Sequence, residues 1–185
     1  MKPGVRVAGG GFRGRSLAVP PGARPTEGRV REALFSIWDD RLDGARVLDL
    51  FAGSGVVGLE AAGRGALTVL CIDEDLRAVK TLEANVSRLG ETLVEIRRLT
   101  LPLGLGRLAA EGVGPFDLVY VDPPYNFHAY EEVLAGLVAL LAADAEVAVE
   151  HSSRRSLPVE VGGLVRVDSR RYGESAVSFY RRGPG

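Results

Sequence analysis

The sequence predicts an α/β protein built on one mostly parallel sheet. From Arg46 onward, short apolar runs rich in β-branched residues alternate with amphipathic helical patterns, an order typical of parallel strands with helices on both faces of the sheet. The last two strand-like runs are joined through Tyr172-Gly173-Glu174, which predicts an antiparallel hairpin at the C-terminal end. With 185 residues and no long linker, the chain should form one domain with a small appendage.

Each element follows from its local pattern. Around residues 26–40, apolar side chains recur at helical spacing after Thr26, a suitable N-cap, and Arg29 and Arg31 fall off the apolar face. The predicted strands, seven in all, are 46–51, 67–73, 93–98, 116–121, 145–151, 164–171 and 175–182. The other predicted helices are about 56–64, 75–89, 104–112 and 129–142. Residues 1–25 are glycine-rich and basic, and form either a short hairpin or a flexible arm in front of the main domain, 26–185.

The composition is that of an ordinary soluble protein, with 46% hydrophobic and 25% charged residues. The one cysteine, Cys71, lies in an apolar strand run, and neither histidine stands in a metal-binding spacing. No signal-peptide pattern is present, and the longest apolar run, 133–143, is too short to span a membrane. We therefore expect a cytoplasmic, monomeric protein without a metal ion or a membrane segment.

Charge is distributed unevenly behind a net charge of −1. Residues 1–31 hold seven Lys or Arg and one acid, and residues 151–185 hold seven Arg and three acids. The centre, 32–150, holds nine basic and twenty acidic residues. Basic ends favour a polyanionic partner such as nucleic acid, and the alternative is a solvated basic surface without a partner.

A glycine loop follows the first strand of the alternating region. It reads Asp49-Leu50-Phe51-Ala52-Gly53-Ser54-Gly55, and glycines there let a ligand approach the backbone at a helix N-terminus. Asp73 ends the next strand, where a carboxylate can accept from both hydroxyls of a ribose. These observations predict an adenosine-type cofactor site. The candidate residues are Asp49, Phe51, Gly53, Ser54, Gly55 and Asp73.

The same loop admits another interpretation, because residues 53–58 match the GxGxxG fingerprint of NAD-dependent dehydrogenases. Asp49 argues against this, since its carboxylate would face a pyrophosphate, whereas it suits a ligand with an ammonium and a sulfonium. A dehydrogenase would also leave the basic N-terminal residues unexplained. A non-catalytic nucleic-acid-binding module is a third hypothesis, but it would not need strands that end on acids.

The tetrapeptide Asp122-Pro123-Pro124-Tyr125 follows the apolar strand 116–121. The prolines fix φ and remove two backbone donors, so the carboxylate and the aromatic ring are held in a rigid turn. Such a turn at the edge of a parallel sheet can hold a flat, amino-bearing ring, with the acid and carbonyls accepting from the amine and Tyr125 stacking on the ring. The simpler interpretation is a turn that closes a strand, with Tyr125 as packing.

Taken together, these motifs resemble the S-adenosylmethionine-dependent methyltransferases that act on exocyclic amines. Four further motifs resemble one family more narrowly, the bacterial 16S ribosomal RNA guanine-N2 methyltransferases of the small-subunit methyltransferase D type. They are Gly10-x-x-Arg13-Gly14-Arg15, Arg24-Pro25-Thr26, Arg29-Val30-Arg31-Glu32-x-Leu34-Phe35 and Tyr180-Arg181-Arg182. One segment departs from such enzymes, which often carry an Asp or Asn after the third strand, because residues 97–101 contain no acid.

The resemblance implies a Rossmann-like class I methyltransferase fold, S-adenosylmethionine as the cofactor, and methylation of guanine N2 in 16S ribosomal RNA or the small ribosomal subunit. It implies catalytic roles for Asp122, Pro123, Pro124 and Tyr125, and adds Thr26 to the cofactor-binding residues. The basic N-terminal residues would contact RNA. They are Arg6, Arg13, Arg15, Arg24 and Arg29. An N6-adenine methyltransferase acting on DNA or RNA remains an alternative, because the tetrapeptide suits that amine equally well.

Overall fold

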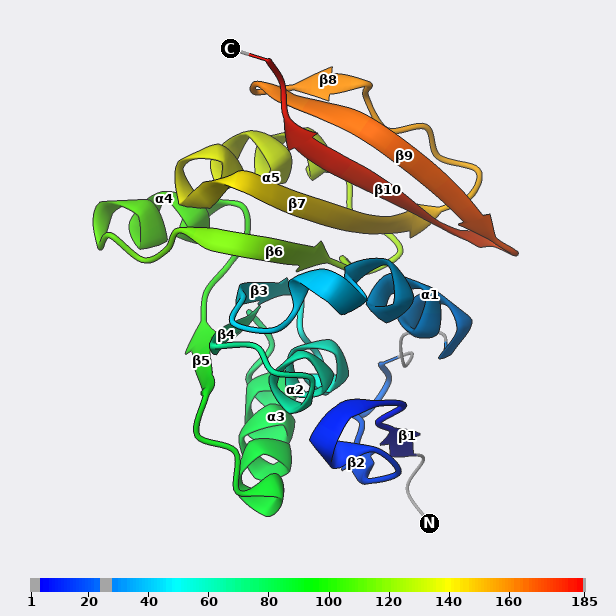
Figure 1. Ribbon diagram of the computed structural model, residues 1–185, viewed down its shortest axis with the longest axis vertical. Coiled ribbons are helices and arrows are strands. Elements are labelled where there is room, and N and C mark those ends of the chain that lie inside the picture. Colours follow the sequence, from blue (N-terminus) through cyan, green and yellow to red (C-terminus); the bar gives the residue numbers. More distant parts are fainter. Residues whose placement is uncertain (1–3, 24–27, 185) are drawn as a thin grey trace.

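The computed structural model describes residues 4–23 and 28–184. Its large sheet contains strands β3 (Arg46–Leu50), β4 (Thr68–Asp73), β5 (Val94–Arg98), β6 (Phe116–Val121), β7 (Leu141–Ser152), β8 (Glu160–Val161), β9 (Leu164–Tyr172) and β10 (Ser175–Arg182). The helices are α1 (Gly28–Trp38), α2 (Val56–Gly63), α3 (Leu76–Leu89), α4 (Leu103–Ala110) and α5 (Tyr130–Leu137). The strand order is β5-β4-β3-β6-β7-β10-β9-β8 (Figure 1).

Strands β3 to β7 run parallel, whereas β10 pairs antiparallel with both β7 and β9. Strands β3 and β6 are neighbours although β4 and β5 lie between them in the chain. The strand order therefore reverses between β3 and β6. In open α/β sheets, ligands bind at the carboxyl ends of the strands beside such a reversal.

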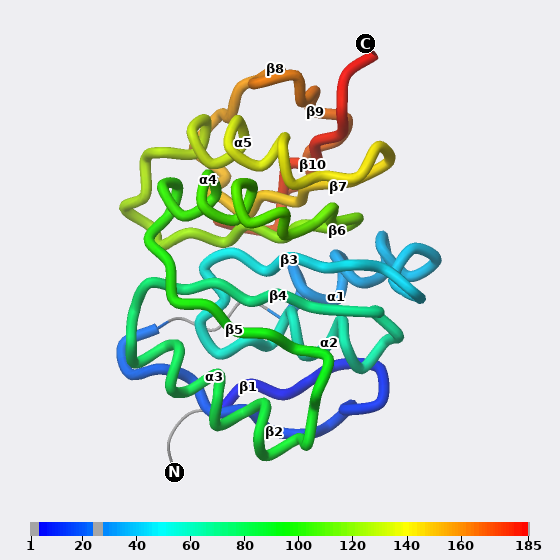
Figure 2. Tube along the Cα trace, turned by 90° about the vertical axis from the view of Figure 1, so that its left-hand side faces the viewer, coloured from blue at the N-terminus to red at the C-terminus, as the bar shows by residue number. Residues whose placement is uncertain are grey.

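Helices cover both faces of the sheet. One hydrophobic core joins α1 and α2 to side chains such as Val47, Val69 and Tyr120, and a second joins α4 and α5 to Leu48, Val119 and others. Figure 2 shows the strands of this sheet in their order from β8 down to β5, with the N-terminal residues below β5. This two-sided burial explains why the central strands are apolar at almost every position.

The N-terminal residues form a hairpin of β1 (Gly4–Arg6) and β2 (Ser16–Ala18), joined through a 3₁₀ turn at Gly10–Phe12. Val5 and Leu17 are buried in the same core as α1 and α2, so the hairpin packs on the main domain. The predicted boundary between residues 25 and 26 lies outside the described residues. No helix in the described part of the chain is long and apolar enough to cross a membrane.

The predicted fold class is confirmed, with two differences. The short strand β8, which pairs with β9 at the edge of the sheet, has no clear sequence pattern and was not predicted. Residues 141 and 142 were predicted as helix, but α5 ends at Leu137, a 3₁₀ turn spans Val138–Leu140, and β7 begins at Leu141. The apolar run suits both structures, and pairing of Leu141 with Phe116 of β6 selects the strand.

Candidate active site

The two sequence motifs meet where the strand order reverses. The backbone N–H of Asp122, just after β6, donates to the carbonyl of Leu50 at the end of β3 over 3.4 Å. The ring of Phe51 then contacts that of Phe127, with centroids 5.0 Å apart, and Phe127 contacts Tyr130. The cofactor loop (residues 51–55) and the Asp122 loop (residues 122–129) therefore pack directly against each other.

Within the Asp122 loop, the four motif residues differ in exposure. Asp122 is half-buried, Pro123 is buried and Pro124 is exposed. The carbonyl of Pro124 accepts from the N–H of Phe127 over 2.9 Å, which closes the turn. Tyr125 is 85% exposed, so its ring does not pack in the core.

The cofactor loop has an unusual backbone. Phe51 has φ of 60°, which is uncommon for a residue with a Cβ, and Gly53 and Gly55 also have positive φ. Gly55 has a φ of 75°, which strains a residue with a Cβ, and a Cβ there would also lie 1.9 Å from Leu82 Cδ1. At Gly53 a Cβ would meet nothing within 4 Å, which leaves open space above the loop. Strained backbone of this kind concentrates at functional sites.

Asp73 holds the loop from the neighbouring strand. Its Oδ2 accepts from the N–H of Gly53 over 2.9 Å, and its Oδ1 accepts from the N–H of Asp75. A pocket of about 300 Å³ lies beside this strand end, lined by Glu74, Arg98, Leu99 and Thr100. Thr100 belongs to the segment that lacks the acid found in many related enzymes. The pocket adjoins Asp73, the predicted ribose contact, through its neighbour Glu74.

Asp49 lies beneath the loop and is only 2% exposed. Its Oδ2 accepts from the N–H of Gly58 over 3.1 Å. Burial raises the pKa of Asp49 to about 7, the bond from Gly58 opposes the rise, and the nearby charge of Asp73 adds to it. A cationic ligand near this carboxyl group would favour its ionised form.

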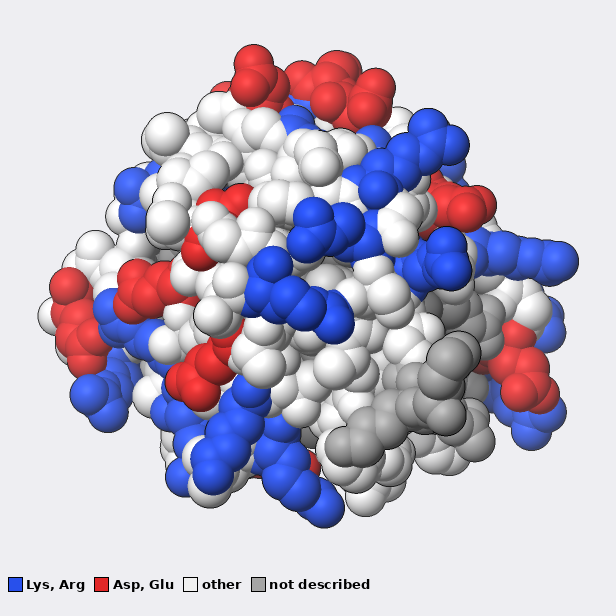
Figure 3. Space-filling view, turned by 90° about the horizontal axis from the view of Figure 1, so that it is seen from below, with Lys and Arg blue, Asp and Glu red and all other residues white. Residues whose placement is uncertain are grey.

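Four of the five arginines predicted to contact RNA lie in the described part of the chain, and all four are exposed. Arg6, Arg13 and Arg15 lie on the hairpin, and Arg29 lies in the first turn of α1. Figure 3 looks at the end of the molecule that carries the hairpin, where several basic side chains lie near the centre, among uncharged residues and some acidic ones. Arg24 and Thr26 fall outside the described residues.

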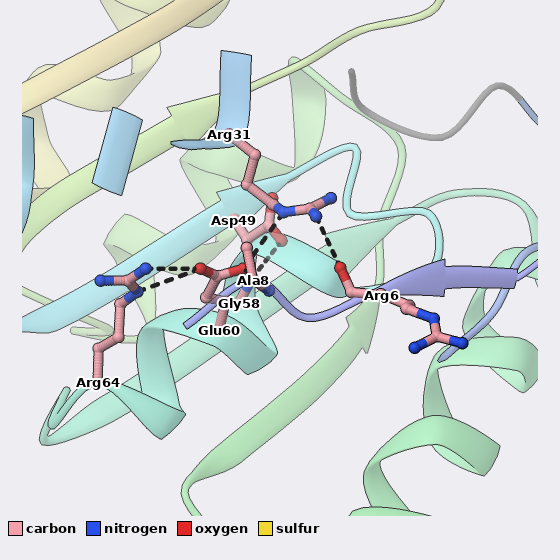
Figure 4. A network of polar contacts seen from close by, with 7 residues as sticks. All are labelled: Arg6, Ala8, Arg31, Asp49, Gly58, Glu60 and Arg64. Carbon is pink, nitrogen blue, oxygen red and sulfur yellow. Dashed lines mark hydrogen bonds and ion pairs between the residues drawn. The ribbon is translucent and has the colours of Figure 1, made fainter. Parts of the chain in front are cut away.

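A buried ionic cluster ties the hairpin to the helices, and it was not predicted. Glu60 of α2 is fully buried, accepts from the N–H of Ala8, and pairs with Arg31 at 3.2 Å and Arg64 at 2.9 Å (Figure 4). Arg31 also donates to the carbonyl of Arg6 over 2.7 Å. Helical spacing placed Arg31 off the apolar face, yet the hairpin covers it and it is only 5% exposed.

Asn85 of α3 forms a second such link, also missed from the sequence. Its Nδ2 donates to the carbonyls of Ala18 and Ser54, each over 2.9 Å, and its Oδ1 accepts from the N–H of Ala18. One buried amide therefore holds both the return strand of the hairpin and the cofactor loop. An asparagine within an otherwise amphipathic helix is a weak signal, and its partners lie far away in the chain.

Glu150 is the third residue that the sequence did not single out. It ends the apolar part of β7, is buried, and accepts a hydrogen bond from the hydroxyl of Tyr120 on β6. The charges of Asp122 and Glu150 both raise the pKa of Tyr120, after the larger effect of burial. Three acids, counting Asp49, thus approach the end of β6, so this edge is electronegative. Across the described ranges, no group of three or more His, Cys, Asp or Glu has a geometry suited to a metal ion.

The strand order, the glycine loop on β3 and the acid at the end of β6 define a class I S-adenosylmethionine-dependent methyltransferase. Similar proteins agree with this class. A solved structure described as the putative methyltransferase yhhF from Escherichia coli has a TM-score of 0.83 and 31% identity, and the match covers 99% of this chain and all of that one.

A family model described as conserved hypothetical protein 95 matches residues 5–181, and the chain belongs to this family. The putative rRNA methyltransferase YlbH of Bacillus subtilis is 34% identical, over 96% of this chain and 99% of that protein. The ribosomal RNA small subunit methyltransferase D of Escherichia coli K12 is 35% identical, over 96% of this chain and 90% of that protein. The predicted family is confirmed. Membership in this family argues against the two alternative hypotheses, a dehydrogenase and a non-catalytic nucleic-acid-binding module.

Proposed function

We propose that this protein transfers a methyl group from S-adenosylmethionine to the exocyclic N2 amine of a guanine in 16S ribosomal RNA. One observation carries the proposal: Asp122 lies beside the cofactor loop, because its N–H donates to Leu50, the last residue of β3 before that loop. The relatives named as ribosomal RNA methyltransferases support the choice of substrate.

The residues around the loop fit this cofactor. The space above Gly53 admits a ligand close to the backbone, and Asp73 lies where it can accept from ribose hydroxyls. The pocket with Leu99 and Thr100 would take the adenine. Asp49, buried without a cationic partner among the described side chains, would stabilise the positive end of the ligand. Thr26 remains a predicted contact.

S-adenosylmethionine supplies an electrophilic methyl group when it is bound. The guanine N2 nitrogen is a poor nucleophile, because its lone pair is delocalised into the ring. Asp122, accepting from the N2 hydrogens, would favour a pyramidal nitrogen and aim its lone pair toward the cofactor site. Asp122 is also the nearest candidate to accept the proton that the amine loses.

Neighbouring groups in the loop would complete the base site. The carbonyl of Pro124 already accepts from Phe127, so the Pro123 carbonyl is the better candidate for a second bond from the amine. Tyr125 exposes its ring and would stack on a base swung out of the RNA. The exposed arginines of the hairpin and of α1 would contact RNA phosphates.

The test is methyl transfer with radiolabelled S-adenosylmethionine to small ribosomal subunits and to free 16S RNA from cells that lack this modification. Nucleoside analysis should show N2-methylguanosine. N6-methyladenosine would instead support the adenine alternative, and no transfer to either substrate would contradict the proposal. Comparing subunits with free RNA also identifies the form of the substrate.

A further inference from the structure

A second basic region lies away from the hairpin, at the C-terminal side of the sheet. A pocket of about 330 Å³ opens between the end of β7, the segment after it, and strands β9 and β10. Nine residues line this basic pocket, including four arginines, three serines and one histidine, and none is acidic. The arginines are Arg154, Arg155, Arg166 and Arg171.

Among the described residues, most arginines of the basic pocket lack a carboxylate partner, whereas several arginines elsewhere in the molecule form ion pairs. Arg166 donates to the carbonyl of Leu157 and Arg171 to that of Gly173, and Arg155 contacts His128 at 3.3 Å. In the described part of the chain, none of these three pairs with a carboxylate. Arg154 alone faces an acid, Glu174, at 3.7 Å between two exposed side chains. By contrast, Arg107 on α4 bonds Glu111 at 2.7 Å.

The pocket also adjoins the proposed base site. Arg155 places its guanidinium 5.1 Å from the centroid of the Tyr130 ring and touches His128, which belongs to the Asp122 loop. Tyr130 packs on Phe127, and Phe127 packs on Phe51 of the cofactor loop. A continuous chain of contacts therefore runs from the cofactor loop to the wall of the basic pocket.

The chemistry of the lining selects the ligand. Guanidinium groups form paired hydrogen bonds with phosphate oxygens, and serine hydroxyls can donate to the remaining oxygens. No Phe, Tyr or Trp side chain lines the pocket, and the ring of its one histidine, His151, is buried, so the lining suits a phosphate better than a base. Within the described ranges, neither ring nitrogen of His151 contacts a carboxylate. Its Nε2 lies 2.9 Å from Ser178 Oγ, and its Nδ1 lies 2.9 Å from the carbonyl oxygen of Ser152. Burial lowers the pKa of His151, and Arg166 and Arg155 lower it further, as expected in a positive field.

We propose that the basic pocket binds a backbone phosphate of the RNA substrate, close to the nucleotide whose base enters the Asp122 loop. The inference rests on the proposed function for the identity of the polyanion. It adds a second phosphate contact on the opposite side of the base site from the hairpin. RNA would then be held on both sides of the flipped nucleotide.

The test compares Arg171→Gln with Arg107→Gln, which removes the same charge from α4, at the other end of the parallel strands (Figure 1). Binding of a short single-stranded oligoribonucleotide is measured over a range of salt concentrations. We expect Arg171→Gln to weaken binding several-fold and to reduce the salt slope by about 0.7, the value for one phosphate contact on a single strand. The double variant Arg154→Gln/Arg171→Gln should show a larger loss.

Kinetics separate this proposal from the proposed function. In methyl transfer to the small ribosomal subunit, Arg171→Gln should raise the KM for RNA and leave kcat and the KM for S-adenosylmethionine unchanged. If Arg171→Gln and Arg107→Gln have equal RNA affinity and an equal salt slope, the proposed phosphate site is overturned. Methyl transfer by the unmutated chain would still support the proposed function in that case. Binding of inorganic phosphate can be followed through the NMR signal of His151. If Arg171→Gln weakens the binding of inorganic phosphate but not the binding of RNA, the pocket binds a small anion, and the proposal is also overturned.

Discussion

The two sides of the site are built in different ways. Around the cofactor loop, polar side chains are buried and bonded within the protein: Glu60 is 0% exposed and Asn85 1%. Around the Asp122 loop, the ring of Tyr125 is 85% exposed, and in the basic pocket Arg166 and Arg171 donate to backbone carbonyls instead of carboxylates. One side is fixed by internal bonds, and the other leaves hydrogen-bond donors and a ring face available.

This difference suits the two ligands. A small cofactor gains from a loop that is held in place before binding, because little ordering remains to be done. A large polyanion such as RNA instead binds to exposed groups, and its phosphates and bases provide their hydrogen-bond and stacking partners. Substitutions on the cofactor side should therefore change the stability of the fold, whereas those on the RNA side should change activity and leave the fold intact.

The largest effect is expected from Glu60→Gln. The substitution leaves the guanidinium of Arg31 buried without its carboxylate, and breaking a buried pair in this way costs about 3–5 kcal/mol. Urea unfolding should show this loss in the free energy of unfolding. The matched control is Glu111→Gln, which also removes an acid that pairs with two arginines but at a more exposed site, so its effect should be far smaller. Equal unfolding midpoints for the two variants would contradict the role given to the cluster.

Asp122→Asn comes next and should act on chemistry alone. Asparagine keeps the size and one acceptor, but its amide donors face the donors of the substrate amine, and it cannot take a proton. We expect kcat to fall by about 10²-fold or more, the scale of losing a positioned acid–base or electrostatic group. Calorimetry should find nearly unchanged affinity for S-adenosylmethionine. A folded, cofactor-bound variant with the unmutated rate would rule out the assignment of Asp122.

The residues in these two predictions also show what the sequence could reveal. Asp122 and the cofactor loop were predictable, because each motif is a continuous stretch at the end of an apolar strand. Arg31 was placed outside the apolar face by helical spacing, and its burial follows from contacts with Glu60 and the backbone of Arg6, which lie far away in the chain. Asn85 and Arg155 were missed for the same reason. Local pattern predicts elements and motifs, whereas these links depend on how the hairpin and the loops dock.

Tyr125→Ala should have a moderate effect that is confined to RNA. Loss of stacking on one base should cost about 1–3 kcal/mol, seen as a higher KM for RNA or a lower kcat/KM. Tyr125→Phe is the control, since stacking needs the ring and not the hydroxyl, and it should keep most of the activity. Because Tyr125 is exposed, both variants should unfold at the urea concentration of the unmutated chain. If Tyr125→Phe loses as much activity as Tyr125→Ala, the hydroxyl and not the ring matters.

A pH-dependent effect concerns the ionisation of Asp49. Its pKa is raised from 3.8 to about 7 in the folded chain, so between these values the native state holds a proton that the unfolded state has lost. The free energy of unfolding of the cofactor-free protein should therefore fall as the pH rises from about 4 to about 7. Asp49→Asn should remove this part of the pH dependence, which urea unfolding at a series of pH values would detect.

Cofactor binding should follow pH in the opposite direction, because a cationic ligand favours the ionised carboxyl group. From about pH 6 to about pH 8 the ionised fraction of a group with a pKa of about 7 rises about tenfold, and the affinity for S-adenosylmethionine should rise by up to that factor. Calorimetry on Asp49→Asn gives the pH dependence that comes from the ligand itself. This contribution is subtracted from the pH dependence of the unmutated protein. If the difference between the two proteins does not change with pH, Asp49 does not sense the charge of the cofactor. The cofactor side would then depend on Asp73 and the backbone of the loop alone.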